Sequence, residues 1–159
     1  MSQVEIVGFD DRFAEDFGRL NYEWIEKSYG VEQHDHDVLD HPRTSVIEPG
    51  GEIFFAVDNE VAIGTVALIP LNANSFELAK MAVAPEARGR GIGEMLMAGC
   101  IEFARDSGAK SIILESNTKQ EAAIKLYRKF GFVEIPLDPN SHFVRANIRM
   151  ELAISESSK

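Results

Sequence analysis

Residues 81–96 read MAVAPEARGRGIGEML, and the interpretation of the whole chain starts from them. Apolar residues up to Val83 predict the end of a strand, Pro85 stops that strand, and a helix is expected from Ile92. The glycine-rich segment 88–93 lies between them. Unpaired N–H groups at a helix N-terminus carry partial positive charge, and glycines let the backbone approach a ligand closely. This segment therefore predicts a pyrophosphate site.

Two familiar nucleotide-binding loops do not match it. A Walker A loop ends in Gly-Lys-Ser or Gly-Lys-Thr, and the sequence contains neither triplet. In a dinucleotide fingerprint that starts at Gly89, the third glycine would fall at Glu94. A glycine-rich turn that merely joins strand to helix is the alternative that stays open.

Hydrophobic periodicity predicts the elements on either side. Phe13, Phe17, Leu20 and Trp24 indicate an amphipathic helix after an N-cap at Asp10 or Asp11. Further helices are expected from Ile92 to a stop at Gly108, and from an N-cap at Thr118 to Gly131. Strands are expected at 4–9, 52–57, 61–69, 76–83, 111–115, 132–135 and 143–152, with a tight hairpin at 58–60 and a turn at 70–75. The order of elements predicts an α/β fold with a largely antiparallel sheet.

Composition narrows the class of protein. The 159 residues carry a formal net charge of −10, which disfavours a general nucleic-acid binder because phosphate neutralisation needs surplus cations. The single cysteine, Cys100, excludes an internal disulfide and is expected to be a packing residue. No signal-peptide pattern and no apolar run long enough for a membrane span is seen. We expect one domain over 1–154, a short tail at 155–159, and a cytoplasmic location.

Two motifs then resemble one family. Arg88-x-x-Gly91-x-Gly93 is similar to the Q/R-x-x-G-x-G/A motif of the GNAT superfamily, the acetyl-CoA-dependent N-acetyltransferases. A second block resembles the family's N…A…LY…GF pattern through Asn117, Ala123, Tyr127 and Gly131-Phe132. The resemblance implies a mixed, largely antiparallel sheet with helices on both faces and a cleft where the fourth and fifth strands splay apart. It also implies acetyl-CoA as co-substrate and no metal.

The resemblance assigns cofactor contacts by position. Backbone groups at 81–83 would pair with pantetheine and direct an N–H at the acetyl carbonyl, N–H groups from 89–94 would hold the pyrophosphate, and Asn117 would bond the pantetheine amide region. The implied cofactor-binding residues are Met81, Ala82, Val83, Arg88, Gly89, Arg90, Gly91, Ile92, Gly93, Glu94, Asn117 and Tyr127.

The sequence offers one candidate for the general acid and several for the general base. Tyr127 is expected to donate a proton to the departing thiolate, since its phenol stays protonated at neutral pH; the alternative is a half-buried packing aromatic. Glu77, in the strand before the glycine segment, is expected to be the base. Glu115, His142 and an ordered water are its competitors, and either glutamate could instead be a solvated strand residue.

The polar segment 29–51 is expected to hold one short helix among loops. Within it, the run His34-Asp35-His36-Asp37 is followed by Asp40 and His41, which allows three interpretations: a metal site, a solvated acidic loop, or a wall of the acceptor pocket. In the last case Tyr22, Trp24 and Tyr29 would help to shape that pocket, although packing is the expected role of Trp24.

We therefore expect an enzyme that moves the acetyl group of acetyl-CoA to a primary amine by direct attack in a ternary complex. The alternatives are a non-catalytic acyl-CoA-binding sensor or regulatory module and a generic nucleotide-binding protein. The acceptor would be a small-molecule or peptide amine, with no nucleic-acid or membrane partner. Relatives of this kind are often homodimers, and the sequence leaves both the acceptor and the oligomeric state open.

Overall fold

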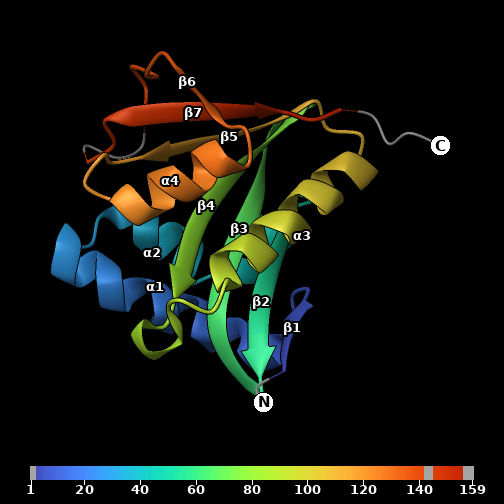
Figure 1. Ribbon diagram of the computed structural model, residues 1–159, viewed down its shortest axis with the longest axis vertical. Coiled ribbons are helices and arrows are strands. Elements are labelled where there is room, and N and C mark those ends of the chain that lie inside the picture. The colour runs from blue at the N-terminus through green and yellow to red at the C-terminus, as the bar shows by residue number, and fades with distance from the viewer. Residues whose placement is uncertain (1–2, 142–144, 156–159) are drawn as a thin grey trace.

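Helices enclose a mixed sheet from both faces in the computed structural model, which describes residues 3–141 and 145–155 (Figure 1). Within that range the sheet has seven strands in the order β1-β2-β3-β4-β5-β7-β6. All neighbours pair antiparallel except β4 and β5, which are parallel. The strands are β1 (Val4–Val7), β2 (Glu52–Asp58), β3 (Val61–Asn72), β4 (Ser75–Val83), β5 (Ser111–Ser116), β6 (Val133–Ile135) and β7 (Ile148–Ala153).

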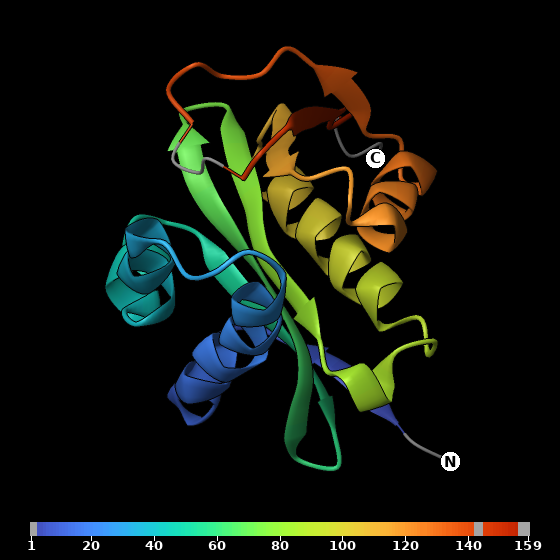
Figure 2. The same ribbon diagram turned by 90° about the vertical axis from the view of Figure 1, so that its left-hand side faces the viewer.

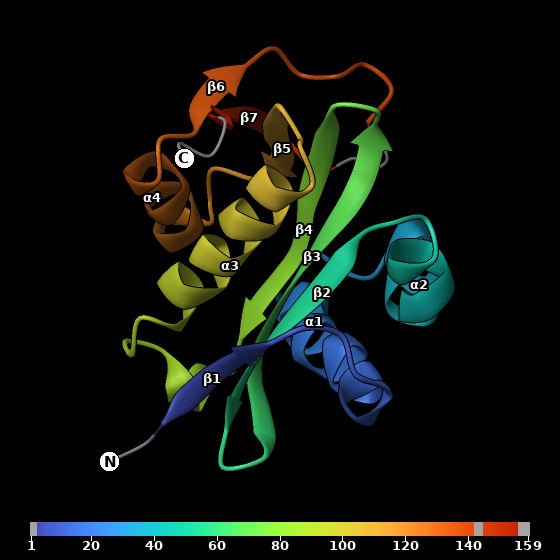
Figure 3. The same ribbon diagram turned by 90° about the vertical axis from the view of Figure 1, so that its right-hand side faces the viewer.

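The helices divide between the two faces of the sheet. One face carries α1 (Ala14–Ser28) and α2 (Gln33–Leu39), and the other carries α3 (Ile92–Asp106) and α4 (Glu121–Lys129) (Figure 3). Short helical turns precede α1 (Asp11–Phe13) and α3 (Pro85–Ala87), and a π-helical turn (Arg43–Ile47) leads into β2. The predicted class, an α/β fold with a largely antiparallel sheet covered on both sides, is confirmed.

Side chains of the central strands point alternately to the two faces of the sheet and contribute to a hydrophobic core on each. Leu68 of β3 belongs to the cluster that contains Leu96 of α3, whereas the adjacent Ala67 belongs to the cluster with Phe17 of α1. Successive strand side chains point to opposite faces, so an apolar run such as that of β3 is buried on both sides. Cys100 is fully buried in the α3 cluster, which confirms its expected packing role.

Strands β4 and β5 stay together only briefly. Their pairing covers Ser75–Glu77 of β4 and Ser111–Ile113 of β5. Beyond that point β4 continues with β3, while β5 continues with β7 across the view of Figure 1. Figure 2 shows the same divergence from the side. The splay that the resemblance implied is therefore present, and it opens the sheet at its centre.

Several predicted boundaries were wrong. Strand β3 runs through Pro70 to Asn72, so the expected turn at 70–75 shrinks to two residues; a register shift next to Pro70 accommodates the proline. The last strand begins at Ile148: the expected start at 143 lies outside the described residues, and 145–147 are not strand. Helix α4 begins at Glu121, because the backbone at 118–120 forms a turn closed by Asn117 instead of a cap at Thr118.

Other local predictions hold. Asn59 and Glu60 form the two-residue hairpin turn with φ of 53° and 68°, and Gly108 and Gly131 follow α3 and α4 in left-handed conformations. Most of the expected tail at 155–159 lies outside the described residues. No helix in the described part of the chain is both long and apolar enough to span a bilayer.

Candidate active site

A cleft of about 1280 Å³ occupies the place where β4 and β5 separate. It runs from the glycine segment before α3 to the C-terminal end of α1. Its walls come from β4, β5, α4 and the segment that precedes β7. The predicted site residues that line it are Glu77, Met81, Ala82, Val83, Arg88, Gly89, Gly91, Ile92, Gly93, Glu94, Asn117 and Tyr127. Positions distant in sequence are thus brought to one cavity.

The glycine segment forms one end of the cleft. Gly89 and Gly91 have φ of 83° and 75°, a region that L side chains avoid, so the path of the loop depends on them. Gly91 is the N-cap of α3 and offers no side chain to cap the first turn. The N–H groups of that turn are therefore left for other acceptors. Arg88 lines the cleft, whereas Arg90 ion-pairs with Asp58 at 2.8 Å and is not among the described lining residues.

A β-bulge lies beside the cleft in the middle of β4. Thr65 pairs with Ala82 and Ala67 pairs with Ala79, so Val66 faces two residues, Lys80 and Met81. Lys80 has φ of 57°. A bulge inserts one extra residue and re-aims the side chains that follow. Simple strand alternation would place Glu77, Ala79 and Met81 on one face of the sheet, and the bulge breaks that alternation before Met81.

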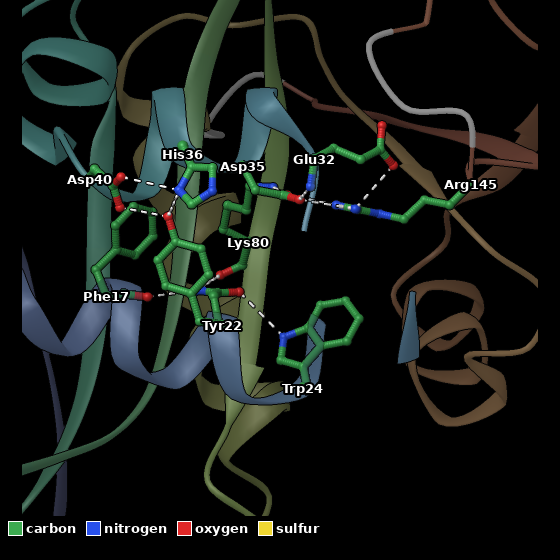
Figure 4. A network of polar contacts seen from close by, with 10 residues as sticks. Phe17, Tyr22, Trp24, Glu32, Asp35, His36, Asp40, Lys80 and Arg145 are labelled. Atoms are coloured by element: carbon green, nitrogen blue, oxygen red, sulfur yellow. Dashed lines mark hydrogen bonds and ion pairs between the residues drawn. The ribbon is translucent and has the colours of Figure 1, made fainter. Parts of the chain in front are cut away.

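The bulge sends the Lys80 side chain toward α2 (Figure 4). Its ammonium donates to Asp35 Oδ1 at 2.5 Å, and Arg145 donates to both Asp35 oxygens at 2.7 and 3.0 Å. Arg145 also bonds Glu32 at 3.2 Å. Side-chain exposures of 0% for Asp35 and 5% for Lys80 make this a buried ion-paired cluster, which we call the Asp35 cluster (Glu32, Asp35, Lys80 and Arg145).

In the Asp35 cluster, burial and hydrogen bonding shift the pKa of Asp35 in opposite directions. Burial by itself would raise the pKa of Asp35, but hydrogen bonds from Arg145 and Lys80 outweigh it and hold the pKa well below its usual range. Burial lowers the pKa of Lys80, and the bond to Asp35 offsets part of that shift. The carboxylate is therefore ionised throughout the neutral range and serves as the anchor of the cluster.

This finding corrects the interpretation of the His34–His41 segment as a solvated loop. Most of the segment is helix α2, and one face of that helix is buried, with Asp35 beneath it. On the exposed side, Tyr22 Oη donates to Asp40 at 2.6 Å and contacts His36 Nδ1 at 2.9 Å (Figure 4). Across 3–141 and 145–155, no group of three or more His, Cys, Asp or Glu side chains is arranged to hold a metal ion.

Tyr127 reaches the cleft from α4. Its side chain is buried against Phe132, with ring centroids 5.8 Å apart. Burial raises the pKa of Tyr127 to about 12. The phenol consequently stays protonated at any physiological pH, so it can donate a hydrogen bond or a proton but cannot serve as a general base.

The base candidates differ in their surroundings. Glu77 lies at the last β4 position that pairs with β5 and lines the cleft just before the strands part. Glu115 lines the same cleft from β5, but its Oε1 accepts a hydrogen bond from Ser141 Oγ at 2.7 Å. His142 lies outside the described residues.

Asn117 makes bonds within the chain. Its Nδ2 donates to the Arg145 carbonyl at 2.8 Å, and its Oδ1 accepts from the Lys119 N–H at 2.9 Å. The side chain therefore ties the end of β5 to the segment before β7. Its expected contact with pantetheine stays a prediction.

Aromatic side chains from α1 line the other end of the cleft. Trp24 and Tyr29 pack edge to face, with ring centroids 6.2 Å apart. Trp24 Nε1 donates to Asn21 Oδ1 at 3.4 Å, and Tyr29 Oη accepts from Gln120 at 3.0 Å, so the polar tips of both rings are bonded inside the protein. Tyr22, the third aromatic expected here, is turned toward α2 instead.

Sequence reasoning missed three residues of this region: Asn21, Lys80 and Arg145. Two left a signal. Asn21 follows Phe17 by four residues in the apolar stripe of α1, where an amide is out of place, and Lys80 interrupts the apolar run 78–83 of β4. Arg145 left none, because its partners lie more than 100 residues away.

Comparison with known proteins names the family. A family model described as the acetyltransferase (GNAT) family matches residues 18–132, well over half of the chain. The chain belongs to the GNAT family. Rat N-acetyltransferase 8B is 31% identical over 101 residues, which cover 60% of this chain and 46% of the relative. An uncharacterized N-acetyltransferase from Schizosaccharomyces pombe is 29% identical, with 74% and 75% covered. The chain spans about half the length of the mammalian relatives it matches.

Solved GNAT structures share the fold. An acetyltransferase of the GNAT family from Staphylococcus aureus superposes with a TM-score of 0.86 at 21% identity, covering 96% of this chain and all of that one. A putative acetyltransferase from Salmonella typhimurium, solved with its cofactor acetyl-CoA, superposes with a TM-score of 0.75 at 17% identity, covering 99% and 98%. At these identities the likeness establishes the architecture alone.

Proposed function

We propose that this GNAT protein transfers the acetyl group of acetyl-CoA to a primary amine by direct attack in a ternary complex. One observation carries the proposal: a single cleft joins an uncapped helix N-terminus to an aromatic-lined end, with the β4 bulge between them. Such a cleft can hold a cofactor and an acceptor side by side. Proximity of the two reactants would supply much of the rate enhancement.

In this proposal the cofactor is held chiefly by backbone groups. N–H groups from 89–94 bind the pyrophosphate, and Arg88 adds a positive charge beside them. Residues 81–83 pair with the pantetheine arm, and Asn117 contributes from the opposite strand. The Met81 N–H stabilises the negative charge that develops on the acetyl oxygen during attack; one donor of this kind is worth about 3–4 kcal/mol.

Tyr127 donates a hydrogen bond to the departing sulfur, in the place expected of a general acid. Because the pKa of Tyr127 is raised to about 12, its phenol is always protonated when the thiolate departs. That pKa is also far above the reference value of about 8.5 for a cysteine thiol, which we take as the guide for the thiol of coenzyme A. We therefore expect Tyr127 to stabilise the thiolate by a hydrogen bond rather than to lose its proton outright.

Glu77 acts as the base that takes the proton from the acceptor ammonium, directly or through one water. Its place at the last paired position of β4, on the wall of the cleft, supports this role, and Glu115, which lines the same cleft from β5, is the alternative base. Glu77 takes one proton from the ammonium, the free amine nitrogen bonds to the acetyl carbon, and the second proton leaves that nitrogen for water as the tetrahedral intermediate collapses. The C–S bond breaks in the collapse, and its electron pair leaves on the sulfur as a thiolate that accepts a hydrogen bond from Tyr127.

Two measurements test the proposal. Calorimetry with acetyl-CoA, ATP and NAD should give heat only for acetyl-CoA, and a panel of primary amines should release free thiol in its presence. Acetyl-CoA binding without thiol release from any amine would favour the sensor. Stronger binding of ATP or NAD would favour a generic nucleotide-binding protein, and no heat with coenzyme A derivatives would overturn the proposal altogether.

A further inference from the structure

Asn21 of α1 lies at the centre of the contacts that hold the β4 bulge. Its side chain is fully buried. Nδ2 donates to the Lys80 carbonyl at 3.0 Å and to the Phe17 carbonyl, one turn earlier on α1, at 3.0 Å. Oδ1 accepts from Trp24 Nε1 at 3.4 Å. Both N–H groups of the amide therefore donate hydrogen bonds, and one of them binds the carbonyl oxygen of Lys80 in the bulge.

We propose that Asn21 is a positioning residue, which sets the orientation of the Lys80–Met81 peptide and so the direction of the Met81 N–H. This inference rests on the proposed function, in which that N–H stabilises the acetyl oxygen. Asn21 would act through the bulge rather than by touching either reactant.

The geometry of a peptide bond links the two atoms. No cis peptide occurs among the described residues, and in a trans peptide the carbonyl and the following N–H point in opposite directions. Because Asn21 draws the Lys80 carbonyl toward α1, the Met81 N–H is directed away from α1. In a regular strand both groups would lie in the plane of the sheet and pair with the neighbouring strands. The hydrogen bond from Asn21 thus holds the Lys80 carbonyl out of the sheet hydrogen bonding, and this fixes the direction of the Met81 N–H.

Lys80 needs such support. It is a non-glycine residue with φ of 57°, a conformation that persists only when the surroundings impose it. Its carbonyl is held by Asn21 of α1, and its ammonium is held by Asp35 of α2. The bulge is therefore fixed from outside the strand, by residues of two helices that lie 59 and 45 positions before Lys80 in the sequence.

The same amide also reaches the acceptor end of the cleft. Trp24, which lines that end, is bonded to Asn21 through its indole N–H. One buried side chain thus contacts both the bulge and the aromatic wall, so the position of the Met81 N–H and that of the wall are set together.

The test replaces the amide without changing its shape. Asn21→Leu keeps the branched outline but removes both donors, and Asn21→Asp keeps the outline and offers no donor when ionised. We expect kcat at saturating substrates to fall by about 10- to 100-fold, the size of a misplaced group near the reacting centre. The Kd for acetyl-CoA should change by less than about threefold, since the pyrophosphate contacts are untouched.

Ser75→Ala is the matched control. Ser75 lies at the other end of β4 and shares a buried 2.7 Å hydrogen bond with Ser111, and neither residue lines the cleft. Its loss should lower the melting temperature but leave kcat unchanged. Each variant is assayed at a temperature at which circular dichroism shows it folded.

The outcomes separate two failures. If wild-type protein binds acetyl-CoA but acetylates no amine, the proposed function fails, and the positioning role of Asn21, which rests on it, fails with it. If the wild type is active and both Asn21 variants keep kcat within about threefold while losing only thermal stability, Asn21 is a structural residue and this inference is overturned.

Discussion

The two ends of the cleft are built in different ways. The end proposed for the cofactor is made largely of one continuous segment, 85–94, which turns through Gly89 and Gly91 and presents the first turn of α3. The end proposed for the acceptor is made of side chains from α1, β4 and the segment before β7, and these are held from behind by Asp35 of α2 and by Asn21. A local segment can be read as a motif, whereas an assembly of distant side chains cannot. A variant that alters one end of the cleft should therefore leave binding at the other end unchanged.

The largest effect is expected from the Asp35 cluster. Asp35→Asn leaves Lys80 and Arg145 without their shared anion and should cost about 3–5 kcal/mol of unfolding free energy, the usual result of removing one partner from a buried ion pair. Urea unfolding measures this loss. Acetyl-CoA affinity of the folded variant should be retained, while the KM for the acceptor rises.

The control for this variant is Asp40→Asn, since Asp40 lies at the exposed end of the same helix. It should cost less than about 1 kcal/mol. The dependence of the unfolding free energy on pH gives a second test of the Asp35 cluster. The pKa of Asp35 is lowered on folding, so its contribution is present above pH 4 and is lost as the pH falls toward the folded pKa. Stabilities of wild type and Asp35→Asn should therefore converge in acid; a constant gap would contradict the assignment.

Tyr127→Phe should lower kcat by about 100-fold with little change in acetyl-CoA affinity, because it removes only the hydroxyl. The loss should be uniform from pH 6 to 9, since the pKa of Tyr127 is raised to about 12 and the phenol does not titrate in that range. Steady-state kinetics across this range measure it. Tyr22→Phe removes a hydroxyl outside the cleft and should leave kcat unchanged. Equal activity of the two variants would remove Tyr127 from the mechanism.

Gly91→Val should weaken acetyl-CoA binding at least about tenfold, because a β-branched residue is strained at φ of 75° and its side chain obstructs a phosphate. Gly108→Val is the matched control: Gly108 has φ of 78° at the far end of the same helix and no atom within 4 Å of an added Cβ. It should destabilise the fold without affecting calorimetric affinity. Similar affinities for the two variants would place the cofactor elsewhere.

The smallest effect separates two neighbouring arginines. Arg88→Ala should weaken acetyl-CoA binding about two- to fivefold, the size of an exposed ion pair, and the difference should shrink as salt is added. Arg90→Ala should change the affinity by less than about twofold, because its guanidinium is bonded to Asp58. The opposite ranking would mean that Arg90 leaves Asp58 when the cofactor binds.

Hydrophobic periodicity and the positions of turn-forming and helix-ending residues predicted most of the fold. The helix from Ile92, its stop at Gly108 and the hairpin at Asn59-Glu60 follow from local rules, and all three are found. The errors occurred where a local rule competed with pairing between strands. Pro70 normally ends a strand, yet β3 continues through it beside a register shift, and the turn closed by Asn117 displaces the expected cap at Thr118.

The acceptor side shows why the rest stayed hidden. His34 to His41 is polar by composition, and nothing within the segment indicates that Asp35 would be enclosed by Lys80 and Arg145, 45 and 110 residues away. The same holds for Asn21, whose partner carbonyl belongs to Lys80, 59 residues along the chain. Such contacts exist only after the sheet has formed.

Local chemistry, therefore, was enough to reveal the family motif, the order of the elements and the glycine segment that lines one end of the cleft, because glycine conformations and helix termini are properties of adjacent residues. Folding alone brought α1 and α2 against β4, buried an aspartate between two cations and imposed a left-handed conformation on Lys80. The physical reason is that burial and ion pairing depend on which distant atoms exclude water, and no short stretch of residues specifies that.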